Sequence, residues 1–314
     1  MTAGTAAPRL TLGAVLFVIA GVTGYAAMDA AGIFLAQTQS VVQIVWARCA
    51  FAMPVVLLVL ARQGGLARLG TSRPLVQVVM GLFPVLGSFS VAGGFGLLSL
   101  AELTALTFAA PLLVVALSAP LLRERTSRHD WIGVLLGFAG ILVMVRPGTD
   151  AFTWAAIFPL GCALFFALYQ IAMRFIGRHD DPVTTLAWSI GTGLVVTSAL
   201  LPLDWRPASV EAWGAMVLSG LLFGTSQFCL IQGFRRAAPA SLTPFTYLQI
   251  IPATLIGIGL FGTWPDAWVV VGAALVIGAG IYVLRGRATS PPRPPRAVHG
   301  GRANPRGTAP ARGR

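Results

Sequence analysis

Long apolar stretches alternate with short polar segments along almost the whole chain. A stretch of about 18 to 25 mainly apolar residues is long enough to cross the hydrocarbon core of a bilayer as one helix. The sequence contains ten such stretches, which predict an all-α integral membrane protein with ten transmembrane helices. Their approximate ranges are residues 10–34, 41–61, 75–98, 103–122, 131–148, 154–175, 183–203, 212–234, 241–262 and 266–284.

The composition also indicates that most of the chain is surrounded by lipid. Of the 314 residues, 56% are hydrophobic and only 10% are charged, whereas a soluble domain carries about 25% charged residues. The net charge of +12 does not indicate a nucleic-acid partner, because the basic residues lie mostly between the apolar stretches or in the C-terminal tail. The first stretch has some features of a signal peptide, but it continues past the small residues near Ala26 where cleavage would fall.

All 22 basic residues are arginines, and their distribution predicts an orientation. With the N-terminus in the cytoplasm, eleven loop arginines fall on the cytoplasmic side and two, Arg146 and Arg206, on the outer side. Both termini are therefore predicted to be cytoplasmic: residues 1–9, and a disordered Arg/Pro/Gly-rich tail over 286–314. The Lys-free, Arg-rich composition indicates a GC-rich bacterial genome, and thus a bacterial inner (plasma) membrane.

The two halves of the chain resemble each other at an offset of 139 to 142 residues. For example, "AELTALTF" at 101–108 corresponds to "ASLTPFTY" at 240–247. We therefore predict two repeats of five helices, over residues 10–148 and 149–285. Because five is an odd number, the repeats would enter the membrane in opposite directions. Inverted repeats are typical of secondary transporters, whose substrate site lies at the repeat interface near the bilayer midplane.

Two prolines occupy matching places in the repeats. Pro111 lies in the fourth stretch and Pro252 in the ninth. A proline removes a backbone donor and crowds the preceding turn, so both are candidate helix breaks beside a substrate site. A tolerated kink in a continuous helix is the alternative interpretation of each.

Asp29 is a charged residue in the second half of the first apolar stretch. A centrally placed Asp costs roughly 2.5–3.5 kcal/mol on insertion scales, so it needs a partner or a function. Arg48 lies within the second stretch, and a rise of about 1.5 Å per residue places both residues roughly 10 Å below the outer surface. They are candidates for an ion pair or a shared cavity that lines a solute pathway. A purely structural pair and a wrong depth assignment are the alternatives.

Further polar and aromatic residues within the apolar stretches are candidates for the same pathway. Tyr25 shares a helical face with Asp29, and Gln170 is the counterpart of Asp29 in the second repeat. Amides and phenols can hydrogen-bond a solute, although bonding between helices is the alternative role. The remaining candidates are Gln227, Gln232, Tyr247, Gln249 and the apolar Phe108.

Several segments together resemble one known family. They are "MDA" (28–30), "QIVWAR" (43–48) and the stretches over residues 121–148 and 238–285. These segments are similar to the EamA-like transporters of the drug/metabolite transporter superfamily. The resemblance implies ten helices in two inverted halves and the movement of small organic solutes, often amino acids or related metabolites. The sequence departs from the family in lacking the Lys that follows "MDA" in many relatives, since it contains no Lys at all.

Other function classes fit the sequence less well. The three histidines lie in expected loops or in the tail, and neither a catalytic nor a metal-ligating cluster occupies a span. No enzyme activity, metal or cofactor is therefore predicted. A channel and a non-transporting structural membrane subunit remain alternatives.

We expect a secondary-active carrier of a small organic metabolite, with an amino acid or a related compound as the first candidate. Alternating access with proton-coupled export is one form of this hypothesis, and an uptake carrier or exchanger is the other. The expected partners are the solute, protons and the lipid bilayer, and the sequence leaves the oligomeric state open.

Overall fold

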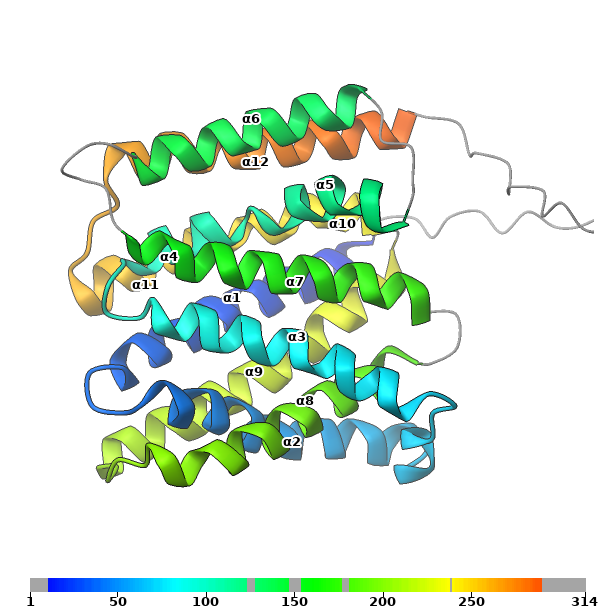
Figure 1. Ribbon diagram of the computed structural model, residues 1–314, viewed down its shortest axis with the longest axis vertical. Coiled ribbons are helices and arrows are strands. Elements are labelled where there is room, and N and C mark those ends of the chain that lie inside the picture. The colour runs from blue at the N-terminus through cyan, green and yellow to red at the C-terminus, as the bar shows by residue number, and fades with distance from the viewer. Residues whose placement is uncertain (1–10, 123–127, 147–153, 177–180, 238, 290–314) are drawn as a thin grey trace, which may run out of the picture.

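The computed structural model describes residues 11–122, 128–146, 154–176, 181–237 and 239–289, and every regular element in these ranges is helical (Figure 1). The α-helices are α1 Leu12–Leu35, α2 Val41–Gln63, α3 Pro74–Gly93, α4 Leu100–Thr107, α5 Ala110–Leu122, α6 Arg128–Val145, α7 Ile157–Ile176, α8 Pro182–Leu200, α9 Val210–Arg236, α10 Pro239–Thr246, α11 Ile250–Phe261 and α12 Ala267–Thr289. Short 3-10 helices are η1 Leu66–Leu69, η2 Trp154–Ala156, η3 Leu201–Leu203 and η4 Tyr247–Gln249.

The described residues contain nine helical segments that are long and apolar enough to cross a membrane, and each overlaps one of the first nine expected stretches. The last expected stretch corresponds to the shorter apolar helix Ala267–Val283. The chain is therefore an all-helical, multi-pass membrane protein. The count of ten crossings in two repeats stays a prediction.

Side chains that satisfy free backbone groups set where helices begin. Ser40 and Gln43 form a capping box at the start of α2, and Ser99 and Glu102 form another at the start of α4. The buried Gln43 amide also donates to the backbone carbonyl of Arg206 (2.8 Å) and accepts from its backbone N–H (2.9 Å). This pairing ties the first turn of α2 to the segment that connects α8 and α9.

The fourth and ninth expected stretches are discontinuous helices. The fourth consists of α4 and α5, separated by residues 108–109, and the ninth consists of α10, η4 and α11. Pro111 is the second residue of α5 and Pro252 the third of α11. Because proline has no backbone N–H, the carbonyl four residues before it has no helical partner, and both interruptions fall in that preceding turn.

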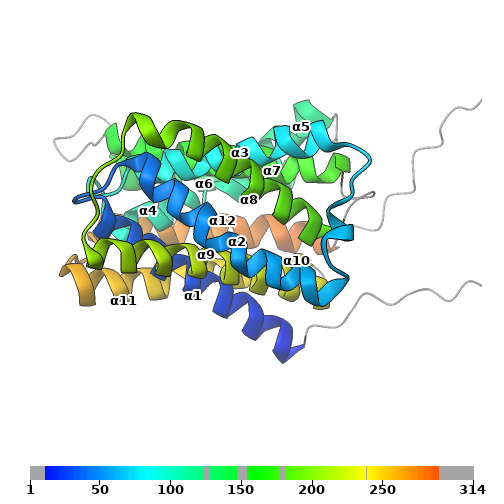
Figure 2. The same cartoon turned by 90° about the horizontal axis from the view of Figure 1, so that it is seen from below.

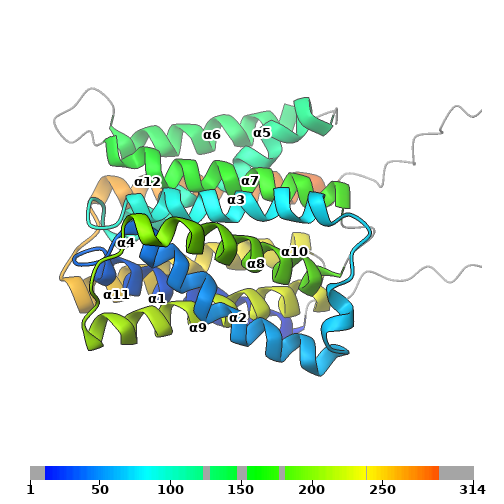
Figure 3. The ribbon, with the colours of Figure 1, turned by 60° about the horizontal axis from the view of Figure 1, so that its bottom comes forward.

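The helices pack in a recurring pattern of long contacts. α1 lies along α9, α3 along α7, and α6 along α12, while α2 contacts both α8 and α9 (Figures 1 and 3). The start of α1 and the end of α12 lie at the same end of the bundle (Figures 1 and 2). This arrangement requires an even number of crossings between them.

The discontinuous helices are packed unequally. α4 contacts α11, and α5 contacts α6 and α7. α5 and α10 make no comparable contact among the described residues, and neither do α11 and α12. The half-helices α4 and α11 are therefore packed together, whereas the half-helices α5 and α10 are not packed together in the described residues.

Candidate functional site

The centre of the candidate site is an ion pair between α1 and α2. Arg48 Nη2 donates to Asp29 Oδ1 at 3.0 Å, and the two side chains are 3% and 17% exposed. The ion pair expected from the depths of the two residues in the sequence is thus present. Its role in transport stays a prediction.

Arg48 is held against an aromatic ring as well as against a carboxylate. Its guanidinium carbon lies 5.1 Å from the centroid of Phe95, within the range of a cation–π contact. A side chain at Gly32 would lie 2.4 Å from the Phe95 ring and 2.8 Å from Arg48 Nη2, so this approach requires glycine. The buried Nε of Arg48 has no hydrogen-bond partner. The guanidinium therefore holds one carboxylate oxygen and retains an unused donor at Nε.

Aromatic residues of two other helices lie near the same face of α1. Tyr25, one turn before Asp29, packs edge-on against Phe223 of α9 at 6.2 Å. Tyr25 also lies close enough to Asp29 and to Tyr169 of α7 to interact electrostatically with both. The Tyr169 hydroxyl lies 3.5 Å from Ser189 Oγ of α8. The Asp29–Arg48 ion pair therefore lies near phenol groups and not in a purely aliphatic interior.

Sequence reasoning missed Phe95, Phe223 and Tyr169. A repeat offset of 140, within the observed range, relates Asp29 to Tyr169 instead of to its neighbour Gln170. The repeat signal alone could have singled out this tyrosine. The other two are ordinary apolar residues in the sequence, and only tertiary packing distinguishes them.

Phe108 and Tyr247 form a second contact, at the two helix interruptions. Phe108 lies between α4 and α5, Tyr247 begins η4, and their rings meet edge-to-face at 5.1 Å. The Tyr247 hydroxyl is buried without a hydrogen-bond partner. A Cβ at Gly280 of α12 would lie 1.9 Å from this oxygen, so glycine is required for the hydroxyl to occupy its position.

The predicted glutamines are less closely associated with the ion pair. Arg236 donates to the side chain of Gln232 (2.9 Å), one turn along α9 near the end of that helix. Gln170, Gln227 and Gln249 are partly exposed residues of α7, α9 and η4. Their role as solute ligands stays a prediction.

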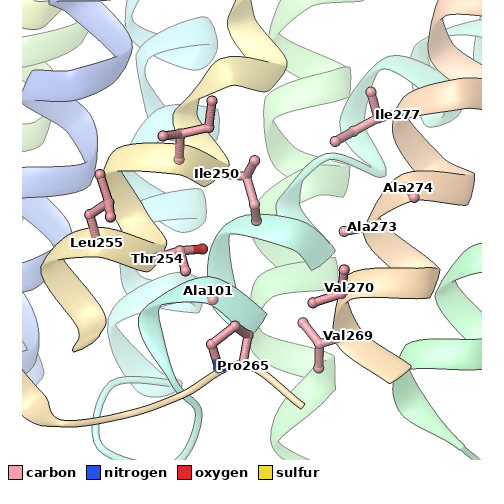
Figure 4. Close-up of a pocket in the computed structure, with 11 residues that line it drawn as sticks. Ala101, Ile250, Thr254, Leu255, Pro265, Val269, Val270, Ala273, Ala274 and Ile277 are labelled. Carbon is pink, nitrogen blue, oxygen red and sulfur yellow. The ribbon is translucent and has the colours of Figure 1, made fainter. Parts of the chain in front are cut away.

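A separate apolar groove of about 410 Å³ lies between α11 and α12 (Figure 4). It includes none of the residues singled out from the sequence, and Thr254 provides the only polar side chain among the residues that line it. A polar solute requires polar partners. We therefore place the candidate solute site at the ion pair and not in this apolar groove.

Metal binding has no visible basis in the part of the chain that the structure describes. No group of three or more His, Cys, Asp or Glu side chains is positioned there to hold an ion. Cys49, Cys162 and Cys229 are free thiols.

An all-helical, multi-pass membrane protein with a charged pair inside its bundle fits the class of membrane transporters, where intramembrane charges mark solute or proton pathways. The model of the EamA-like transporter family matches residues 12–146 and again 153–285. The chain belongs to the EamA-like transporter family, which confirms the resemblance noted in the sequence and identifies a transporter rather than an enzyme.

Curated relatives carry transporter names. The riboflavin transporter of Vibrio cholerae serotype O1 is 28% identical over 185 residues, which cover 58% of this chain and 61% of that protein. The S-adenosylmethionine uptake transporter of Rickettsia prowazekii is 27% identical over 235 residues, or 74% and 80% of the two chains. A solved crystal structure aligns with a TM-score of 0.58 at 19% identity, covering 86% of this chain and 99% of the other. This last likeness supports the fold alone.

Proposed function

We propose that this transporter is a secondary-active carrier of a small organic solute, and that Asp29 and Arg48 are the polar part of its pathway. One observation carries the proposal: a charged pair with a single hydrogen bond lies inside a bundle of membrane helices. A pair kept only for stability gains most when every donor and acceptor is satisfied. Arg48 instead keeps a buried Nε without a partner.

The geometry favours a solute that brings its own charges. A solute carboxylate can accept from the guanidinium of Arg48, and a solute ammonium can donate to Asp29. Such an exchange replaces one ion pair by two and leaves neither protein charge unpaired. If the solute carries only an anionic group, Asp29 loses its counter-ion when Arg48 turns, and a proton can restore its balance. Asp29 is thus the proposed coupling group for protons.

The relatives widen the proposed solute class beyond amino acids. Their names specify riboflavin and S-adenosylmethionine, and both compounds contain a planar heteroaromatic ring. Phe95, Phe223 and the two tyrosines near the ion pair provide faces on which such a ring can stack. We propose a metabolite that combines a planar ring with charged or zwitterionic groups. The "uptake" in the name of the Rickettsia relative favours uptake over export.

We further propose the two inverted five-helix repeats and cytoplasmic termini. The double match of the family model supports two repeats. The packing supports their relation, since α1 on α9 corresponds to α7 on α3, and α2 on α9 corresponds to α8 on α3. The excess of loop arginines at one end supports the orientation.

Counterflow in proteoliposomes tests the function. The full chain is reconstituted with an internal load of S-adenosylmethionine, riboflavin or mixed amino acids, and entry of the labelled compound is followed with and without a pH gradient. We expect rapid exchange of a ring-containing solute and loss of exchange, or of its gradient response, in Asp29→Asn. Asp204→Asn is the matched control, because Asp204 is a half-exposed loop residue with a looser ion pair of 3.7 Å to Arg206.

Three results decide the proposal. Exchange that depends on Asp29 and not on Asp204 supports the pathway. Unchanged exchange and pH response in a folded Asp29→Asn variant would assign the ion pair to structure alone. Exchange of amino acids but not of ring-containing solutes would overturn the proposed solute class while leaving the carrier function intact.

A further inference from the structure

The apolar groove between α11 and α12 has a buried floor and exposed walls. Ala101 of α4 and Val269 and Ala273 of α12 form the floor, and they are 4%, 3% and 5% exposed. Leu255 of α11 and Val270 of α12 project along the walls and are 65% and 54% exposed (Figure 4). The groove is therefore deep enough to expose α4 between the two helices that flank it.

The position of the groove along the helices fixes what surrounds it. Its walls belong to the membrane-crossing segment Pro244–Phe261 and to the apolar helix Ala267–Val283. One end reaches Pro265, in the connection between them, where Trp264 and Trp268 are both largely exposed. Exposed tryptophans are typical of the level of the lipid headgroups. The groove thus runs from the membrane interface into the hydrocarbon layer.

We propose that the groove binds one acyl chain of a membrane phospholipid, with the headgroup at the level of Trp264 and Trp268. An acyl chain matches the apolar lining and is the solvent at this depth. Arg146, ion-paired with Asp266 at 2.5 Å, places a guanidinium beside the mouth, where it can attract a phosphate.

Occupancy of the groove bears on the position of α11. α11 rests on α4 but not on α12 among the described residues. A chain inserted between α11 and α12 fills the space into which α11 would otherwise move. The bound lipid thus keeps α11 against α4, whose C-terminal end leads into the interruption at Phe108.

Photolabelling in nanodiscs tests the site on the full chain. The bilayer contains a phospholipid with a diazirine on its acyl chain, and labelled peptides are identified by mass spectrometry after irradiation. We expect adducts on the α4 peptide at Ala101, because that buried residue lines the floor of the groove. Ala273→Phe, which places a ring on the floor, should abolish this adduct. Val271→Phe, on the lipid-exposed face of the same helix and outside the groove, should leave it unchanged.

Adducts confined to Leu255 and Val270, with Ala101 unlabelled in the wild type, would overturn the proposal, because ordinary surrounding lipid labels the walls alone. Persistent labelling of Ala101 in folded Ala273→Phe would do the same. An absence of adducts on Leu255 and Val270 as well as on Ala101 would also overturn it, because it would mean that protein, such as a second copy of this chain, covers the groove. The wild-type pattern decides the question even where Ala273→Phe fails to fold, and none of these readouts requires transport activity.

Discussion

Removing both members of the Asp29–Arg48 pair should destabilise the fold by less than the sum of the two single removals. In Asp29→Asn, the guanidinium of Arg48 stays 3% exposed and loses the charge that balances it. Breaking a buried pair in this way costs about 3–5 kcal/mol. In the double variant Asp29→Asn/Arg48→Met, neither charge remains. Its cost should therefore fall short of the sum of the two single costs by about 0.5–3 kcal/mol.

The assay is the free energy of unfolding of the full-length protein in mixed micelles, titrated with SDS and followed by circular dichroism. Wild type, the two single variants and the double variant complete the cycle. Asp204→Asn is the control for loss of one carboxylate, because its ion pair with Arg206 is about half exposed and 3.7 Å long. An exposed pair of this kind contributes only about 0–1 kcal/mol.

Additive costs across the cycle would refute the reasoning, because they would mean that the charges of Asp29 and Arg48 do not depend on each other. A cost for Asp29→Asn no greater than that for Asp204→Asn would refute it as well. The second result would indicate that water or lipid headgroups already balance the guanidinium.

Three further predictions concern single contacts, each measured by the same SDS unfolding. Gly32→Ala should lower the unfolding free energy by about 1–3 kcal/mol, because the new Cβ meets the Phe95 ring and Arg48. Gly13→Ala is the control: its Cβ would have nothing within 4 Å, so stability should change by less than about 1 kcal/mol. Equal effects would contradict the contact at Gly32. Gln43→Leu should lower the unfolding free energy by about 1–3 kcal/mol, because the backbone C=O and N–H of Arg206 lose their partner. A neutral result would mean that water replaces the amide. Tyr247→Phe should raise the unfolding free energy by about 1 kcal/mol because the removed hydroxyl is buried without a partner. A loss of stability would reveal an unseen partner.

The sequence predicted the helices well because membrane crossing leaves a long signal. Each expected stretch overlaps helical structure, although the fourth and the ninth are interrupted, and the depth argument brought Asp29 and Arg48 together. The aromatic surroundings were not predictable in the same way. Phe95 lies in the turn after α3 and Phe223 on α9, and both look like ordinary lipid-facing residues until tertiary packing places them beside the ion pair and Tyr25.

The apolar groove between α11 and α12 was not predictable from the sequence either, for a different reason. Ala101 and Ala273 are small residues in apolar stretches that contain many others. Whether two neighbouring helices close over such residues depends on the angle at which they diverge. Hydropathy carries no information about that angle, so only the packing of α11 and α12 reveals the groove.

The unequal packing of the discontinuous helices has a geometric consequence. α4 touches α11, while α5 and α10 stand apart in the described residues, so the two bent elements form a V with its apex at the end of the bundle near the α11–α12 connection. On the proposed repeat relation, each repeat can adopt the shape now held by the other. Exchanging the two shapes would join α5 to α10, part α4 from α11, and turn the V to open at the opposite membrane face. The packing of the bent helices thus contains the outline of a second state, in which the ends of α5 and α10 are the ones that would meet.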